Sequence, residues 1–203
     1  MNQRFQKTKT VLSTYVERVG AFRPNARFYL ISVIISGASL GVYRLLFNFY
    51  VLSLGYNEAL LGTLITTSSL TALIAALPMG YLVDVIGRKS ALIGGTLAVS
   101  AAIVAMILWP SAGMFVVMNV LLGLGQSITG VTMGPFLMEN SSDKERTYLF
   151  SFASGLQTAS NSLGNWIGGS LPTWLSAMNL GESATSPAAY GWSLGVIALG
   201  GVV

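Results

Sequence analysis

The amino-acid sequence predicts an all-helical membrane protein that crosses the bilayer several times, and three observations support this fold class. Of 203 residues, 53% are hydrophobic and 9% are charged, whereas an ordinary soluble domain has about 25% charged residues. The charged residues are confined to short segments between long uncharged stretches, and the basic ones fall in alternate loops. A chain of this size cannot bury so much apolar surface in one core, so the excess must face lipid.

The uncharged stretches predict five complete spans and the start of a sixth. A helix needs about 20 apolar residues to cross the hydrocarbon, and it satisfies its own backbone hydrogen bonds there. The run 90–138 is long enough for two helices, and the segment from Trp109 to Gly113 supplies the turn between them. The expected spans are 28–54, 59–83, 90–109, 113–138, 147–175 and 190–203.

The last of these stretches is too short to cross the bilayer before the chain ends at Val203. It is either a re-entrant or interfacial segment or a span that the sequence cuts short. We expect the second, which would make the chain the front part of a longer protein.

The distribution of basic residues predicts that the N-terminus is cytoplasmic, because basic residues near short loops stay on that side. Ten of the 11 basic residues would lie there. They are Arg4, Lys7, Lys9, Arg18, Arg23, Arg27, Arg88, Lys89, Lys144 and Arg146. This pattern explains the net charge of +4 without a nucleic-acid partner. We expect the protein to lie in the cell (plasma or inner) membrane.

Residues 1–27 are expected to form a basic cytoplasmic segment rather than a cleaved signal peptide, because the apolar run at Phe28 is too long and no small-residue cleavage site follows. Apolar residues recur in this segment at helical spacing: Val11, Leu12, Tyr15, Val16, Val19 and Phe22. They indicate either a helix that lies on the anionic inner surface of the membrane or a disordered leader.

The composition lacks the residue types that enzymes commonly use for catalysis. We therefore expect no catalytic activity, no cofactor and no metal ion. The chain has no cysteine and no histidine, which removes the commonest metal ligands and the commonest general base. The spans hold no Asp, Glu or His away from their ends and no Ser–Lys pair.

A motif between the second and third spans carries the most specific information. Gly80 would let a neighbouring helix approach, and Asp84, at the membrane border, needs a cation or a helix N-terminus nearby. Gly87 allows a tight turn, while Arg88 and Lys89 hold that turn in the cytoplasm. An ordinary basic loop would explain the last two residues but not the spaced glycines and aspartate.

The segment from Gly80 to Leu92 resembles the signature loop of the major facilitator superfamily, G-x-L-x-D-x-x-G-R-K-x-x-L, although Val85 replaces a basic residue that is usual there. The resemblance implies a major-facilitator-type helical bundle, with this chain (28–203) as its N-terminal six-helix half and a C-terminal six-helix half as a partner that this sequence lacks. It also implies secondary transport of a small solute by alternating access around a midplane site.

The resemblance assigns a gate to the cytoplasmic end. Asp84 would meet the partner half, and Arg88 would pair with an acid at the end of the fourth span, for which Glu139 is the candidate. Arg146 belongs to the same charged region, where a solvated loop with a helix cap is the alternative. The gating residues are therefore expected to be Gly80, Asp84, Gly87, Arg88, Lys89, Glu139 and Arg146.

The segment from Gly164 to Gly169 resembles the core of a motif from drug/proton antiporters of the family, but Asn165 stands in place of its proline and Ser160 in place of its earlier glycine. Small residues in a membrane helix also serve close packing. The segment therefore does not fix the direction of transport.

Polar residues at membrane depth usually face a cavity or a partner, and they define the candidate solute site. Arg44 shares a helical face with Gly37, Gly41 and Asn48 and lies about 5 Å from the middle of its expected span. It either faces the bundle and favours an anionic solute or snorkels to the surface. The expected solute-binding residues are Arg44, Asn48, Gln126, Gln157, Asn161, Asn165 and Trp166.

Three alternatives remain beside a transporter. The first is a non-transporting membrane solute sensor or scaffold with the same fold, and the second is an intramembrane enzyme, which the missing catalytic residues disfavour. The third is a complete half-length protein that pairs with another copy. Because the spans lack deep acids, we expect a transporter of this kind either to couple through its other half or to follow the solute gradient.

Overall fold

Every regular element that the structure describes is an α-helix. The computed structural model describes residues 24–178, 183 and 185–200, so the predictions for the N-terminal segment up to residue 23 lie outside the described residues. The helices are α2 (Pro24–Ser53), α3 (Glu58–Ile86), α4 (Arg88–Leu108), α5 (Ala112–Glu139), α6 (Asp143–Ala177) and α7 (Pro187–Gly200). They follow the expected spans closely, although α2 and α6 begin four residues earlier.

Four of the described helices, α2 to α5, are long and apolar enough to cross a membrane. The helix α6 has 35 residues, which is ample length, but its sequence contains many Ser, Asn, Gly and Thr residues, which lower its hydropathy. The all-helical membrane fold is therefore confirmed, while the count of five complete spans stays a prediction.

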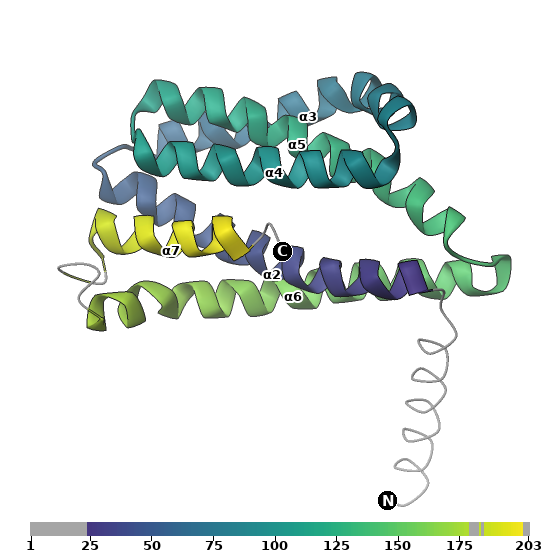
Figure 1. Cartoon of the computed structure of the whole chain (residues 1–203). Coiled ribbons are helices and arrows are strands. Elements are labelled where there is room, and N and C mark those ends of the chain that lie inside the picture. The colour runs from purple at the N-terminus through teal and green to yellow at the C-terminus, as the bar shows by residue number, and fades with distance from the viewer. Residues whose placement is uncertain (1–23, 179–182, 184, 201–203) are drawn as a thin grey trace, which may run out of the picture.

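The helices form two layers (Figure 1). The helices α3, α4 and α5 pack together in one layer, and α2, α6 and α7 pack together in the other. The hydroxyl of Tyr56 donates a hydrogen bond to the Pro110 carbonyl across 3.4 Å, which joins the α2–α3 and α4–α5 loops at one end of the bundle. We call this the Gly55 end, and we call the opposite end, which holds the α3–α4 and α5–α6 connections, the Gly87 end.

Side-chain caps explain where several helices begin. The side chain of Asn57 accepts a hydrogen bond from the Leu60 amide (3.0 Å) at the start of α3, and the Ser111 hydroxyl accepts one from the Met114 amide (3.3 Å) at the start of α5. Such caps satisfy amides that have no partner within the helix. The loops at the Gly55 end are thus fixed by local hydrogen bonds.

Candidate functional site

The predicted polar face of α2 exists, but its residues meet different surroundings. Gly37 and Gly41 are buried against α6, whereas Arg44 is exposed and Asn48 is half-buried. The glycines therefore bring α6 close to α2, and the two polar side chains extend from the same face just beyond that contact.

Arg44 carries a charge that nothing in the described part of the chain neutralises. The ion pairs Arg88–Glu139 and Asp143–Arg146 involve other residues, and among the described residues no hydrogen bond reaches Arg44. Arg44 lies between five and six residues past the midpoint of α2, or about 8 Å along its axis, which is inside a hydrocarbon layer of about 30 Å. A guanidinium at the centre of such a layer costs about 2.5–3.5 kcal/mol even on the most lenient scale. It therefore calls for water or an external negative charge.

Three residues of α6 with amide side chains, Gln157, Asn161 and Asn165, lie along the same contact between α2 and α6. A Cβ on Gly37 would lie 3.0 Å from Nε2 of Gln157. A Cβ on Gly41 would collide with the backbone oxygen of Asn161 and lie 3.0 Å from the Asn165 amide nitrogen. The side-chain oxygen of Asn161 is buried and accepts no hydrogen bond. The side chain of Gln157 thus reaches the glycine face from which Arg44 extends, whereas Asn161 and Asn165 meet this face through their backbones, and Asn165 is exposed.

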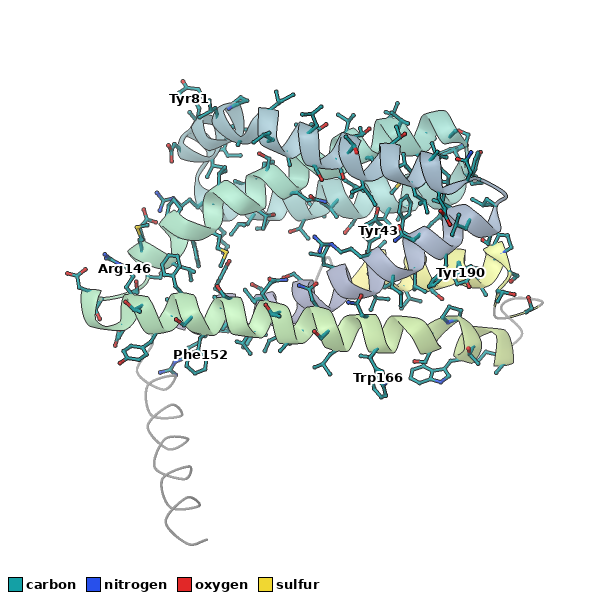
Figure 2. All side chains as sticks on the ribbon, turned by 180° about the vertical axis from the view of Figure 1, so that it is seen from behind. Tyr43, Tyr81, Arg146, Phe152, Trp166 and Tyr190 are labelled. Carbon is teal, nitrogen blue, oxygen red and sulfur yellow. The ribbon has the colours of Figure 1, made fainter. Side chains whose placement is uncertain are left out.

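Trp166 does not join this group within the chain. Its side chain is 78% exposed, and Figure 2 shows it on the side of α6 that faces away from the other helices. The sequence placed it beside Asn165, but neighbouring residues on a helix point about 100° apart, so adjacency in sequence did not mean a shared face.

One face of α5 is buried at both ends and open in the middle. Phe115, Leu122, Gln126 and Leu137 recur on this face at helical spacing. Phe115 and Leu137 are 0% exposed and Leu122 is 2% exposed, whereas Gln126 is exposed. Gly130, one turn beyond Gln126, is also exposed, and a Cβ there would meet nothing within 4 Å.

The buried ends of this face are the places where α5 touches α2. At the Gly55 end the rings of Phe115 and Phe47 lie 5.9 Å apart in an edge contact. At the Gly87 end the rings of Phe136 and Tyr29 lie 5.1 Å apart, beside a cluster in which Leu137 packs with residues of α2 and α6.

Between these two contacts, Arg44 of α2 and Gln126 and Gly130 of α5 are exposed. We call this region the central opening and define it by these three residues. Tyr43 lies beside it, between the two layers (Figure 2). Sequence reasoning missed Gly130, although its position one turn from Gln126 was the available signal.

At the Gly87 end, Gly87 is the single residue between α3 and α4. It has φ +86° and ψ 145°, a conformation that is essentially restricted to glycine. The reversal places the next residue, Arg88, at the start of α4, where its guanidinium forms an ion pair with the Glu139 carboxylate at the end of α5. This is the pairing expected from the sequence, and it ties the α3–α4 connection to α5.

The remaining candidate gating residues of the loop motif are exposed or uncrowded. Asp84 and Lys89 are exposed, and neither forms an ion pair within the described residues. A Cβ on Gly80 would meet nothing within 4 Å, so no described helix makes the close approach expected there. Any contact at Gly80 or Asp84 must come from outside the part of the chain that the structure describes.

Arg146 forms a local contact instead of joining the Arg88–Glu139 pair. Its guanidinium lies 3.0 Å from the Asp143 carboxylate, one turn away on α6. The Ser142 backbone amide donates to the Glu145 carboxylate across 3.5 Å, as in a capping box, and the Ser142 hydroxyl donates to the same carboxylate across 2.8 Å. This charged segment therefore caps the start of α6.

No group of His, Cys, Asp or Glu residues in the described ranges could hold a metal ion. Comparison with known families gives one match: the family model described as Major Facilitator Superfamily matches residues 29–203. No curated protein and no solved structure matched the chain.

Proposed function

Because the chain belongs to the major facilitator superfamily, whose members carry small solutes across membranes, we propose that it is a secondary active or facilitative transporter that works by alternating access. It is a multi-pass membrane protein. The observation that carries the mechanism is the central opening between α2 and α5, because a solute site must lie at membrane depth and be closed by movable contacts on both sides.

The proposed solute site consists of the polar residues around this opening. Arg44 and Asn48 belong to α2, Gln126 to α5, and Gln157, Asn161 and Asn165 to α6. The unpaired side-chain oxygen of Asn161 supports this assignment, because a buried acceptor without a partner costs free energy that a solute donor can offset. Trp166 lies on the other side of α6, so it would contact the solute only if a partner formed part of the site on that side.

The proposed gate lies at the Gly87 end. The Arg88–Glu139 pair holds the α3–α4 connection against α5, and the exposed Asp84 is available to a second half of the transporter. The neighbouring surface of α3 also lacks a partner in the described structure, since Leu77 is 87% and Tyr81 is 76% exposed. Lipid, a C-terminal six-helix half, or both would cover this surface.

The alternate placing of basic residues supports an orientation in which the Gly87 end and the N-terminus are cytoplasmic, in the plasma or inner membrane. The helices hold no Asp or Glu away from their ends within the described residues. Coupling to protons would thus depend on groups outside this part of the chain, and the alternative is transport along the solute gradient.

The absence of cysteine allows a test that needs no knowledge of the solute. Gln126→Cys is labelled with a membrane-impermeant maleimide in right-side-out and in inside-out vesicles. Alternating access predicts labelling from both sides. Ser127→Cys is the matched control, because Ser127 is the next residue of α5 but is 5% exposed, so it should react from neither side.

Labelling of Gln126→Cys from one side only would rule out alternating access through this opening. A panel of radiolabelled small solutes in proteoliposomes then distinguishes a carrier from a solute sensor. Solutes that stabilise the protein against heat but never cross the membrane would favour the sensor.

A further inference from the structure

We propose that the solute carries an oxyanion group and that Arg44 binds it. This inference rests on the proposed function, because it names the class of solute that would occupy the central opening. Arg44 is always charged, and within residues 24–178 and 185–200 no carboxylate pairs with it. A negative group must therefore be supplied from elsewhere, and a bound solute supplies it at the site of transport.

The other polar groups of the site are neutral, so the net charge of the opening is positive. Asn48, Gln126, Gln157, Asn161 and Asn165 all carry amides. Among the described residues, Arg44 is the one Asp, Glu, Lys or Arg that lies away from a helix end. A cationic solute would meet repulsion from Arg44 with no carboxylate to offset it. The charge balance favours an anion over a cation or a neutral sugar.

The guanidinium narrows the class further. Its planar array of donors matches the two oxygens of a carboxylate, phosphate or sulfate group. Halide ions lack this geometry, so an oxyanion is the better fit.

The positions of the site residues also give the solute an orientation. The contact between the rings of Phe47 and Phe115 gives a common level on α2 and α5. Arg44 lies three residues from this level on α2, and Gln126 lies eleven residues from it on α5. The difference of eight residues corresponds to about 12 Å along the helices. The anionic group would thus lie toward the Gly55 end, with the rest of the solute extending toward the amides.

A charged-reagent experiment tests the positive potential at Arg44. Asn48→Cys is placed one turn from Arg44, with about 5–6 Å between the Cβ atoms. It is labelled in the intact protein with a sulfonate-bearing and with a trimethylammonium-bearing methanethiosulfonate, and each rate is divided by that of a free thiol. We expect the anionic-to-cationic rate ratio to fall by at least about tenfold when Arg44→Gln is added. Arg44→Lys should keep most of the ratio.

An unchanged ratio in Arg44→Gln would overturn the proposal, because it would mean that a carboxylate from another part of the protein already neutralises Arg44. Arg44 forms no ion pair and no side-chain hydrogen bond with the described residues, so Arg44→Gln should fold. Size-exclusion profiles of both Arg44 variants check this point.

Solute protection tests the class directly. Phosphate, sulfate, and mono- and dicarboxylates are compared with neutral sugars and quaternary ammonium ions for their ability to slow maleimide labelling of Gln126→Cys. We expect protection by at least one oxyanion, and we expect that protection to weaken by at least about tenfold in Arg44→Gln. Protection by sugars or by cations, undiminished in Arg44→Gln, would contradict the proposal. Labelling of Gln126→Cys from both sides of the membrane without solute tests alternating access separately. The oxyanion proposal and alternating access can therefore each be contradicted without the other.

Discussion

Gly164 of α6 lies directly against Ala38 of α2, so that a Cβ on the glycine would collide with the Ala38 backbone oxygen. At the level of the candidate site, α2 and α6 therefore pack backbone against backbone. One turn away, a Cβ on Gly168 would lie 3.0 Å from Cγ1 and 3.1 Å from Cα of Val42. This close packing explains Gly164 and Gly168 of the segment from Gly164 to Gly169 without any appeal to an antiporter motif.

Gly164→Ala is expected to destabilise the protein. The added methyl group has backbone on the other side, which cannot move as a side chain can, and overpacking of this kind costs about 1–3 kcal/mol. Thermal unfolding in detergent, followed by tryptophan fluorescence, should show a lower midpoint than the parent protein.

Gly155→Ala is the matched control on the same helix, because a Cβ there meets nothing within 4 Å. Alanine has the higher helix propensity by about 1 kcal/mol, so this variant should match or exceed the parent midpoint. Equal midpoints for the Gly164 and Gly155 variants would refute the packing account.

The sequence predicted the helices well because the bilayer imposes a simple rule on them: long uncharged runs become helices. It also predicted that Arg88 pairs with Glu139, because the loop motif and the end of α5 carry those charges at fixed positions. The side of α6 on which Trp166 lies could not be predicted from the sequence, for a physical reason. Its orientation depends on which side of α6 packs against α2, and the buried glycines set that side.

The central opening was harder to predict for a similar reason. Gln126 could be picked out as a polar residue at depth, but Gly130 has no side chain to draw attention. The position of Gly130 matters because Phe115 and Leu137 are buried at the two ends of the same face of α5.

Gly87→Ala is expected to lower stability through backbone strain alone. The conformation at Gly87, with φ +86°, costs a residue with a Cβ about 1–3 kcal/mol, while a Cβ there would have free space. The measurement is again the thermal midpoint. Gly80→Ala is the control, since Gly80 is helical and equally uncrowded; a comparable loss in both variants would argue against strain as the cause.

Reversing the charge of Arg88 is expected to loosen the Gly87 end. The pair is partly exposed, with side-chain exposures of 25% for Arg88 and 60% for Glu139, so its strength should be about 0.2–1 kcal/mol. In Arg88→Glu, maleimide labelling of Gln126→Cys from the Gly87 end should rise about two- to fivefold. The double variant Arg88→Glu/Glu139→Arg should return most of the way to the parent rate.

The Asp143–Arg146 pair provides the comparison for this experiment. It is more exposed, at 91% and 42%, and it joins two residues of one helix turn. Asp143→Asn should therefore leave the labelling rate of Gln126→Cys nearly unchanged. An effect as large as that of Arg88→Glu would mean that general surface charge, and not the contact between α4 and α5, controls access.

Asp84→Asn is expected to abolish nearly all transport while the protein still reaches the membrane. Asp84 is exposed and forms no ion pair in the described structure, so the fold within this chain should not need its charge. The proposed contact with a second half does need it. Uptake into proteoliposomes, compared at equal amounts of inserted protein, measures the effect, and near-normal uptake would remove Asp84 from the gate.

Filling the central opening should block the solute without unfolding the protein. Gly130→Leu places a large side chain where a Cβ meets nothing within 4 Å, so no packing energy is lost and helix propensity improves, because Leu ranks just below Ala, which is about 0.8–1 kcal/mol better than Gly. We expect an unchanged or higher thermal midpoint together with at least about a tenfold slower labelling of the adjacent Gln126→Cys, since access through a filled passage requires side chains to move aside. Gly130→Ala, which adds one methyl group, should label almost normally. If Gly130→Leu labels as fast as Gly130→Ala, the exposure of Gln126 arises from the lipid-facing side of α5, and the opening is not the route of the solute.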